Sequence, residues 1–369
     1  MAPHTATAGE CRAADGDDAG LSAAQRLALL NVWQRGFPLC DEPFAAVGAT
    51  LGLSGLQVLQ AYRQCARDGV LSRIGAVFAP GSGGASTLAA MAVPTDRLEA
   101  VAAIVSAHPG VNHNYERENA RNLWFVMTGA STVQVEQSIA LLEADTGLPV
   151  LRLPMLRPYR IDLAFDLAFD RATGPAQGLT PQMRHGMASA SVCTTPMLAA
   201  EDWPLAALAE QGLPLVKQPY AHWARRLACT PAQVQTTLEQ WLHQGVLKRF
   251  GVVVRHHELG IAANAMTVLD VPDADVDAAG RALAAQPGVT LAYRRARATG
   301  WPYNLYCMVH GAHRSAVLQV LQRALEHSGL AGVPREVLFS RRRFKQTGAR
   351  RFAAAAPQAQ DEGVADAIG

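Results

Sequence analysis

The sequence contains two divergent copies of one unit, and this internal repeat limits what the chain can fold into more than any other feature. The segment GVLSRIG at residues 69–75 returns as GVLKRFG at residues 245–251. Further along, HPGVNHNYER at 108–117 returns as QPGVTLAYRR at 286–295, and NLWFVMTGA is matched later by NLYCMVHGA. Because the matched segments keep their order and nearly their spacing, we expect two copies of one structural unit of about 140 residues.

The first half of each copy has the pattern of three helices. Apolar residues recur at helical spacing, and Ser54 in the first copy and Thr230 in the second stand where a cap would start the third helix. A β-ribbon is expected to follow, VLSRIGAVFAP in one copy and VLKRFGVVVRHHELG in the other, with Arg73 and Arg249 at matching places as structural residues. Three helices followed by a β-ribbon are typical of a winged helix-turn-helix.

The second half of each copy changes to a strand-rich pattern. In the first copy STLAAMAVP is a predicted strand, DRLEAVAAIVSAHP a helix, and GVNHNYER and NLWFVMTG two strands, before another helix and a last strand. This βαββαβ order is that of a ferredoxin-like domain. The predicted fold class is therefore α+β, a tandem duplication of a winged helix-turn-helix followed by a ferredoxin-like domain.

These patterns divide the chain of 369 residues into seven segments. The segment between the copies is rich in Gly, Ser, Thr, Pro and Ala, as expected of a linker. The predicted segments are a disordered N-terminus at 1–20, winged helix-turn-helix 1 at 21–82, ferredoxin-like domain 1 at 83–165, a linker at 166–199, winged helix-turn-helix 2 at 200–260, ferredoxin-like domain 2 at 261–350 and a disordered tail at 351–369.

Composition narrows the class of protein. The N-terminal residues are polar and no stretch of about 18 apolar residues occurs, so we expect a cytoplasmic protein that does not contact a membrane. The 6 cysteines stand singly without a C-x-x-C pair, which argues against a zinc or iron–sulfur site. Nearly all of the 33 basic residues are arginine, which binds carboxylates bidentately, although a GC-rich genome would produce the same bias.

This domain order resembles the Lrp/AsnC family of regulators, whose second domain pairs its sheets in dimers and binds small effectors. Five segments narrow the resemblance, since they are similar to the two subunits of siroheme decarboxylase, here fused in one chain as in the denitrifier NirDL type. They are SRIGAVFAPGSGGASTLAAMAVP, GVNHNYERENARNLWFV, KRFGVVVRHHELG, AYRR and WPYNLYCMVHG. The resemblance implies a carboxy-lyase that removes two acetate carboxylates from siroheme and gives 12,18-didecarboxysiroheme in heme d1 biosynthesis.

The substrate itself indicates what such a reaction needs from the protein. Loss of carbon dioxide from an acetate group leaves electron density on the methylene carbon, and the conjugated ring accepts it. The protein therefore has to supply a proton donor, for which imidazole is suited near neutral pH, and cations that hold a polycarboxylate. No organic cofactor is expected, and the iron is part of the siroheme substrate.

Three histidines are candidate proton donors. His113 lies on a predicted strand that carries Tyr115 and Arg117 on the same face, and the second copy has no histidine at that position. His310 and His256 come from the second copy, and either is a candidate ligand of the substrate iron. If the two sheets pair about a pseudo-twofold axis, these histidines meet in one asymmetric pocket. The alternative is that each is an ordinary strand or loop histidine.

The cations expected to hold the substrate carboxylates lie mainly on predicted strands. The candidate substrate-binding residues are Tyr115, Arg117, Arg255, Tyr293, Arg294 and Arg295. Arg255 is included because it precedes His256, and the pair matches an arginine-histidine motif of the family. On strands 288–297 and 336–345 we expect the cations that serve the substrate on the inner faces, because alternation sends half of the side chains outward. The alternative for the remainder is a solvated basic strand.

Two other functions are consistent with these residues. A helix-turn-helix can make the chain an Lrp/AsnC-like DNA-binding transcriptional regulator, but the third helix of the second copy, PAQVQTTLEQWLH, has no arginine or lysine to contact phosphates. The other alternative is a non-catalytic tetrapyrrole-binding protein. We expect siroheme as partner and no nucleic acid, and either a monomer with an internal pseudo-dimer or a homodimer.

Overall fold

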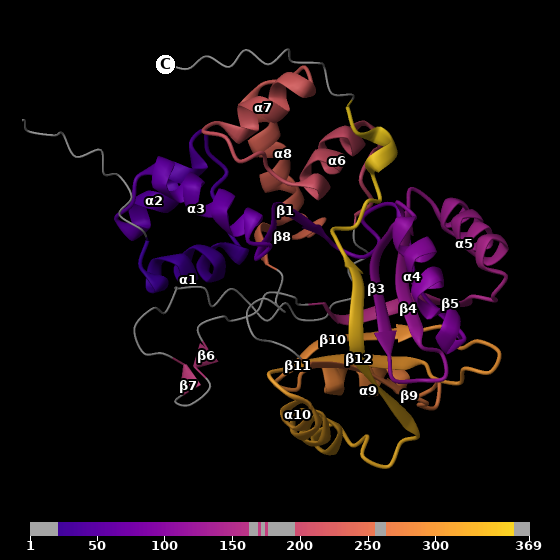
Figure 1. The fold of residues 1–369 in the computed structure, drawn as a ribbon. Coiled ribbons are helices and arrows are strands. Elements are labelled where there is room, and N and C mark those ends of the chain that lie inside the picture. The colour runs from indigo at the N-terminus through magenta and orange to yellow at the C-terminus, as the bar shows by residue number, and fades with distance from the viewer. Residues whose placement is uncertain (1–20, 162–168, 171–173, 176–195, 255–262, 358–369) are drawn as a thin grey trace, which may run out of the picture.

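The computed structural model describes residues 21–161, 169–170, 174–175, 196–254 and 263–357 (Figure 1). Figure 1 shows a helical half, built from the first part of each copy, and a strand-rich half, built from the second part of each copy. The two copies therefore do not form two separate lobes, because each contributes to both halves of the molecule.

The helical half holds two three-helix modules on one hydrophobic core. They are α1 (Ala23–Asn31), α2 (Pro43–Leu51) and α3 (Gly55–Arg67) from the first copy, and α6 (Trp203–Gln211), α7 (Pro219–Arg226) and α8 (Pro231–His243) from the second. Ser54 and Thr230 cap α3 and α8, as predicted, each in a capping box with the glutamine three residues later. Because the buried apolar side chains of both modules belong to one cluster, the modules form a single body.

The strand that follows each module pairs with the equivalent strand of the other copy. β1 (Leu71–Phe78) runs antiparallel to β8 (Leu247–Val254), with Gly75 opposite Gly251. The expectation of a β-ribbon within each copy is therefore wrong for the described residues, which form one shared ribbon. Glycine is needed at its centre because the helical backbone lies against it: a Cβ at Gly75 would be 2.7 Å from the Ala209 carbonyl oxygen.

The second part of each copy has the predicted βαββαβ order, and the α+β duplication is confirmed. The first copy has β2 (Ala85–Met91), α4 (Leu98–Ala107), β3 (Val111–Arg117), β4 (Leu123–Gly129), α5 (Thr132–Thr146) and β5 (Leu151–Ile161). The second copy has β9 (Ala263–Leu269), α9 (Val276–Ala284), β10 (Val289–Arg295), β11 (Leu305–Gly311), α10 (Arg314–His327) and β12 (Arg335–Gln346). Two short strands, β6 (Phe169–Asp170) and β7 (Gly174–Pro175), pair within the expected linker.

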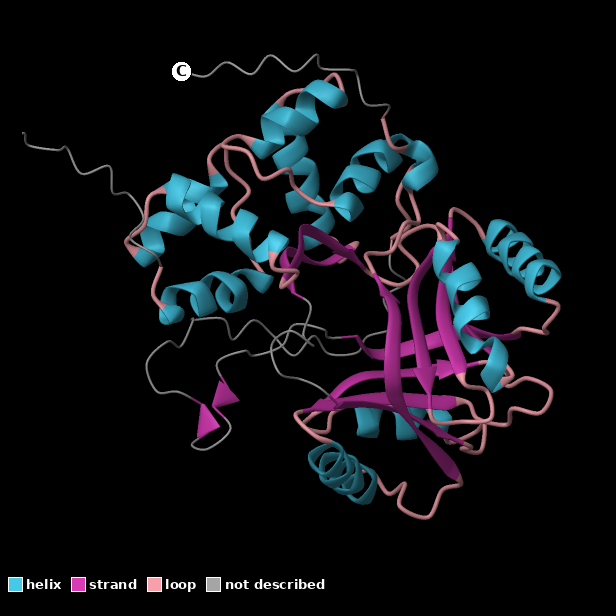
Figure 2. Ribbon diagram, viewed as in Figure 1, coloured by secondary structure: helices cyan, strands magenta, loops and turns pink. Residues whose placement is uncertain are grey.

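The two ferredoxin-like sheets close into one barrel with the strand order β10-β11-β9-β12-β3-β4-β2-β5. The last strand of each copy joins the sheets, since β5 pairs with β2 and with β10 of the second copy, and β12 pairs with β9 and with β3 of the first. Figure 2 shows the helices on the outside of the barrel. Apolar side chains from both copies, among them Trp124, Met266 and Tyr306, fill the inside, so the barrel is a packed core.

Each copy's last strand is also fastened to the first barrel helix of the other copy. From β5, Tyr159 donates a hydrogen bond of 2.5 Å to Asp277 of α9, and Arg157 forms an ion pair of 2.7 Å with the same carboxylate. The Tyr159 ring lies directly on Gly280. From β12, Lys345 donates to backbone carbonyls at the C-terminal end of α4.

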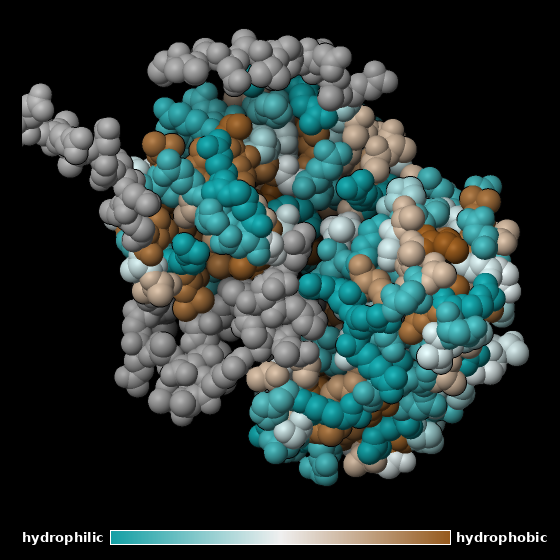
Figure 3. All heavy atoms as spheres, viewed as in Figure 1, coloured by the Kyte–Doolittle hydropathy of each residue, from teal (hydrophilic) through white to brown (hydrophobic). Residues whose placement is uncertain are grey.

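The basic strand β12 presents part of its arginines to solvent. Arg341 and Arg342 are exposed and form ion pairs with Glu116 on β3, and Figure 3 shows hydrophilic residues gathered along this strand. Arg343 lies opposite Tyr115 of β3. Of the three consecutive arginines, only Arg343 therefore remains a candidate for the inner-face cation that we expected on strand 336–345.

The described end of the chain is ordered further than the sequence predicts. Phe352 is fully buried in the core of the helical half, so the expectation of a disordered tail is wrong for residues 351–357. Residues 1–20 and 358–369 lie outside the described residues.

Among the described helices, none alone has the length and apolar content of a membrane span. Only α2 and α3 taken together have that length and apolar content, and a bend of 100° separates them.

The contact between Tyr159 and Gly280 yields a stability prediction. A Cβ at Gly280 would lie within 2.5 Å of Tyr159 Cδ2. The overpacking in Gly280→Ala should lower the free energy of unfolding by about 1–3 kcal/mol. This loss should exceed the gain of about 1 kcal/mol that alanine has over glycine inside a helix. Gly332→Ala is the control, since nothing lies within 4 Å of its Cβ position. Urea unfolding measures both variants, and equal stabilities would contradict the proposed packing.

Candidate functional site

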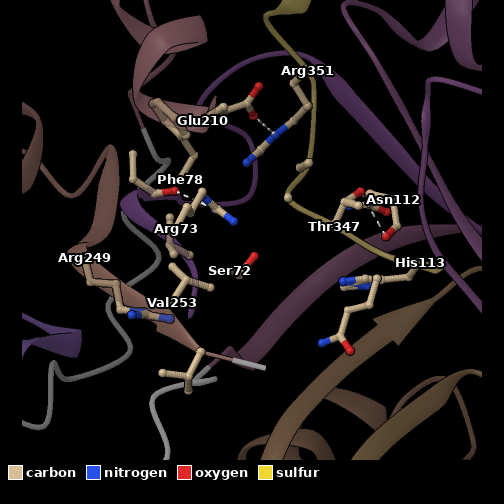
Figure 4. A pocket seen from close by; sticks show the side chains of 16 residues that line it. Ser72, Arg73, Phe78, Asn112, His113, Glu210, Arg249, Val253, Thr347 and Arg351 are labelled. Atoms are coloured by element: carbon tan, nitrogen blue, oxygen red, sulfur yellow. Dashed lines mark hydrogen bonds and ion pairs between the residues drawn. The ribbon is translucent and has the colours of Figure 1, made fainter. Parts of the chain in front are cut away.

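A cavity of about 250 Å³ lies where the helical half meets the barrel (Figure 4). Its lining includes Ser72 and Arg73 of β1, Arg249 of β8, Asn112 and His113 of β3, Glu210 of α6, and Gln346, Thr347, Gly348 and Arg351 at the C-terminal end. Figure 4 shows Arg73 and His113 facing the cavity from opposite sides. Both copies and both halves of the molecule therefore form this one pocket.

The strand β3 places its side chains largely as the sequence predicts. Asn114 points outward and donates to the Ala102 carbonyl oxygen of α4, at 3.2 Å. On the opposite face the Arg117 guanidinium lies 5.5 Å from the centre of the Tyr115 ring, and the His113 ring is 6.3 Å from that ring. A register shift between Val111 and His113 brings Asn112 to the pocket as well, which alternation alone does not predict.

His113 is held in its neutral form. Burial lowers the pKa of its imidazole to about 4, and the positive charge of Arg117 lowers it further in the same direction. The free protein therefore presents an uncharged ring to the cavity at neutral pH. An anion bound beside this ring would favour the protonated form, because an opposite charge raises the pKa of a histidine.

Arg117 is a buried cation among neutral groups. Its Nη1 donates to the Asn264 side-chain oxygen at 3.3 Å and to the Leu338 carbonyl oxygen at 3.0 Å. Burial lowers the pKa of its guanidinium to about 10, an effect partly offset by Tyr115 and Tyr293. The charge is thus solvated by fixed dipoles inside the barrel, close behind His113.

The second copy repeats this arrangement, with Arg294 on the outer face where the first copy has Glu116. Arg295 is buried, donates to the Leu153 carbonyl oxygen and lies 4.6 Å from the centre of the Tyr293 ring. Arg294 points to the outside of the barrel, where it pairs with Asp273 at 3.6 Å and with Asp277 of α9 at 3.8 Å. The expectation that Arg294 binds substrate together with Arg295 is corrected, because alternation places neighbours on opposite faces.

The remaining predicted residues lie away from this cavity or outside the described residues. His310, on β11, has its Nδ1 2.9 Å from the Thr290 hydroxyl oxygen and lies opposite Asn264, the residue that contacts Arg117. It does not line the cavity. Arg255 and His256 fall in the stretch 255–262, which lies outside the described residues.

Two pocket arginines were assigned by sequence to a structural role. Arg73 donates from Nη2 to the Ala76 carbonyl oxygen at 3.1 Å, while its Nε is buried and has no hydrogen-bond partner among the described residues. Burial lowers the pKa of Arg73, and Glu210 partly opposes this. Arg249 donates to two backbone carbonyls and is 7% exposed. The signal that could have identified them is their recurrence at one place in both copies.

Glu210 and Arg351 were missed altogether. Their ion pair of 3.2 Å joins α6 to the segment after β12. Neither stands in a recognisable motif, and Arg351 belongs to the segment predicted as a disordered tail. With Arg73 and Arg249, they give the cavity three arginines and one carboxylate among the described residues, an excess of positive charge suited to a polycarboxylate ligand.

Comparison with protein families assigns both kinds of domain. The AsnC-like ligand binding domain matches residues 82–160 and 258–345, and the siroheme decarboxylase NirDL-like HTH domain matches residues 27–71 and 205–247. The matches fall on both copies, in the order that the repeat predicts.

Individual proteins extend this comparison over most of the chain. The siroheme decarboxylase NirDL subunit of Paracoccus denitrificans is 40% identical over 88% of this chain and 96% of its own. The siroheme decarboxylase NirD subunit of Stutzerimonas stutzeri is 52% identical over 38% of this chain and 91% of its own. A crystal structure of siroheme decarboxylase NirDL in complex with an iron-uroporphyrin III analogue superimposes with a TM-score of 0.61, at 25% identity, over 90% of this chain and 95% of that one.

The lowered pKa of His113 predicts how stability changes with pH. In the unfolded chain the imidazole takes up a proton near pH 6.5, whereas in the folded chain it does so near 4, so stability is lost as pH falls through this window. The His113→Gln variant lacks this titrating group. Between pH 7 and pH 4 its free energy of unfolding should therefore fall by about 3 kcal/mol less than that of the parent. Urea unfolding at both pH values tests this, and parallel losses would contradict it.

Proposed function

The chain belongs to the siroheme decarboxylase family of the fused NirDL type, and we propose that it removes two acetate carboxylates from siroheme to give 12,18-didecarboxysiroheme for heme d1 biosynthesis. As a siroheme decarboxylase it is a carboxy-lyase. The observation that carries the proposal for this chain is the cavity that sets one neutral imidazole, His113, against buried arginines from both copies. The iron belongs to the substrate, and the proposed chemistry uses no organic cofactor.

Substrate binding follows from the size and charge of the cavity. Its volume of about 250 Å³ is below the usual range of small-molecule sites, so it encloses an acetate-bearing edge of the macrocycle rather than the whole ring. Arg73 of β1 and Arg249 of β8 both line this space. A carboxylate at this position forms charge-assisted hydrogen bonds that fix the edge of the ring beside His113.

Proton transfer then follows from the charge balance. The acetate carboxylate leaves as carbon dioxide, and the electron pair of the broken carbon–carbon bond passes to the methylene carbon and the conjugated ring. His113, protonated once the anionic substrate is bound, gives its proton to that carbon and a methyl group forms. Each turnover thus consumes one proton and releases one carbon dioxide, and His113 is recharged from solvent.

Loss of the second acetate carboxylate also requires a proton donor. We assign His310 to this role because it projects from β11 near Asn264, the residue that bonds to Arg117. Arg117, Tyr115, Tyr293 and Arg295 keep their proposed role in substrate binding through the family resemblance. Arg255 and His256 keep their proposed roles in carboxylate binding and proton donation through the family resemblance, and His256 or His310 is the proposed ligand of the substrate iron.

The helix-turn-helix modules favour the enzyme over a DNA-binding regulator. Arg63 of α3 donates from Nε and Nη2 to the Leu215 carbonyl oxygen of the other module, at 3.1 and 2.8 Å. Gln235 of α8 donates to Asp41 of the first module at 3.0 Å. Side chains that a regulator would turn to DNA are thus engaged within the chain.

Because the barrel closes with its own two copies, we expect a monomer, which a mass measurement in solution tests.

The activity is tested by anaerobic incubation with siroheme. Mass spectrometry should show the successive loss of two carboxylates, and carbon dioxide should be released in the same amount. A folded protein that binds siroheme but leaves it intact after prolonged incubation is a tetrapyrrole-binding protein, and that outcome would overturn the proposed activity.

The proposed donors give a second prediction. His113→Ala and His310→Ala should each slow turnover by about 100- to 10,000-fold, the usual contribution of a general acid, while siroheme still binds. His327→Ala, an exposed residue at the end of α10, is the control and should keep the parental rate. Wild-type rates in both donor variants would show that other groups supply the protons.

A further inference from the structure

The chain after β12 crosses from the barrel to the helical half. We name residues 347–357 the C-terminal strap; it is the yellow segment that rises toward α6 in Figure 1. At its start, the Thr347 N–H donates to the Asn112 carbonyl oxygen at 2.7 Å. At its end, Arg226 donates to the Pro357 carbonyl oxygen at 2.8 Å. The strap thus ties the two halves of the molecule together across the cavity.

One buried carboxylate holds the middle of the strap. Glu210 on α6 is 5% exposed, and its Oε1 accepts from Arg351 Nε at 3.2 Å. Its Oε2 accepts from the Phe352 N–H at 3.1 Å. The Phe352 ring is fully buried between Phe78 and Trp203, with ring centres 5.0 and 5.4 Å apart. Glu210 therefore fixes both the side chain and the backbone of the strap at one point.

The strap is itself a wall of the cavity. Gln346, Thr347, Gly348, Ala349 and Arg351 all line it. Gly348 lies so close to the pocket arginine that a Cβ there would be 2.8 Å from Arg73 Nη1. Figure 4 shows Glu210 and Arg351 on one side of the cavity, with Thr347 beside Asn112 on another. The position of the strap thus sets the space in which the Arg73 guanidinium lies.

Stability alone does not account for a carboxylate at position 210. A buried ion pair gives back in attraction about what it costs in lost hydration, so the pairing with Arg351 is no reason for a charge here. The Phe352 N–H needs an acceptor, but a neutral amide would supply one as well. Glu210 also acts on Arg73 through its charge, and Arg351 pairs with the same carboxylate. The carboxylate therefore balances two cations at the edge of the pocket.

We propose that Glu210 is a positioning residue of the decarboxylation: it holds the C-terminal strap against the cavity so that Gly348 and Arg73 keep the substrate edge beside His113. Glu210 acts through Arg351, Phe352 and Arg73 and has no contact with the reacting carbon. The inference rests on the proposed function, since it names the residue that shapes the same site.

The test compares siroheme kinetics in the parent, Glu210→Gln and Glu210→Ala. Glu210→Ala releases the strap and should raise the KM for siroheme about 10- to 100-fold, the loss expected for charge-assisted hydrogen bonds, with kcat within about threefold of the parent. Glu210→Gln keeps an acceptor for the Phe352 N–H, so its KM should lie between those of the parent and Glu210→Ala. If Glu210→Ala does not fold, Glu210→Gln alone decides. A KM above that of the parent then supports the proposal, and a KM equal to it overturns the proposal.

Limited trypsin digestion gives an independent measurement of the strap. Arg350 and Arg351 are cleavage sites within it. Cleavage there should be faster in Glu210→Ala than in the parent, and siroheme should slow cleavage in the parent. Equal cleavage rates in the two proteins would show that Glu210 does not hold the strap.

Glu143 offers a matched control. It accepts from Arg152 at 2.7 Å and from the Val150 N–H at 2.8 Å, the same two kinds of bond that Glu210 makes, but it joins α5 to β5 away from the cavity. Glu143→Ala should lower the melting temperature and leave the KM for siroheme unchanged. A purely structural Glu210 would behave in the same way, and that result overturns the inference.

The two proposals fail in different ways. A parent chain that neither binds nor decarboxylates siroheme overturns the proposed function, and the role of Glu210 with it. A parent chain that decarboxylates siroheme, beside a folded Glu210→Ala with the parental KM, overturns the role of Glu210 alone.

Discussion

The last strand of each copy hydrogen-bonds to the sheet of the other copy, and the rest of the structure depends on this exchange. β5 and β12 each pair on both sides, which closes the barrel and leaves no unpaired edge in its strand order. Since β12 ends beside β3, the exchange also delivers the C-terminal strap to the side of the molecule where His113 lies. The pocket is thus a consequence of how the copies are paired, and neither copy contains it alone.

Duplication followed by divergence explains why this pocket is asymmetric. The pseudo-twofold arrangement keeps Arg73 equivalent to Arg249 and Arg117 equivalent to Arg295, so both copies supply cations. The imidazole occurs at position 113 only, where the second copy has Leu291. Both copies therefore contribute positive charge, whereas the imidazole that lines the cavity comes from the first copy.

The helix-turn-helix modules take part in building the pocket. They pack on each other through one apolar core, and the ribbon that follows them forms part of the pocket. The buried arginines of that ribbon are costly to desolvate, and backbone carbonyls offset part of the cost. The helix-turn-helix half thus contributes cations to the pocket.

The sequence by itself determined the repeat, the order of helices and strands, and the common face of His113, Tyr115 and Arg117, because hydrophobic period and alternation are local properties of a chain. It did not determine which strand pairs with which: the predicted ribbon within each copy became a ribbon between copies. It also left Glu210 and Arg351 unrecognised. Strand partners and buried ion pairs are chosen by contacts between residues far apart in the chain, which only the tertiary structure brings together.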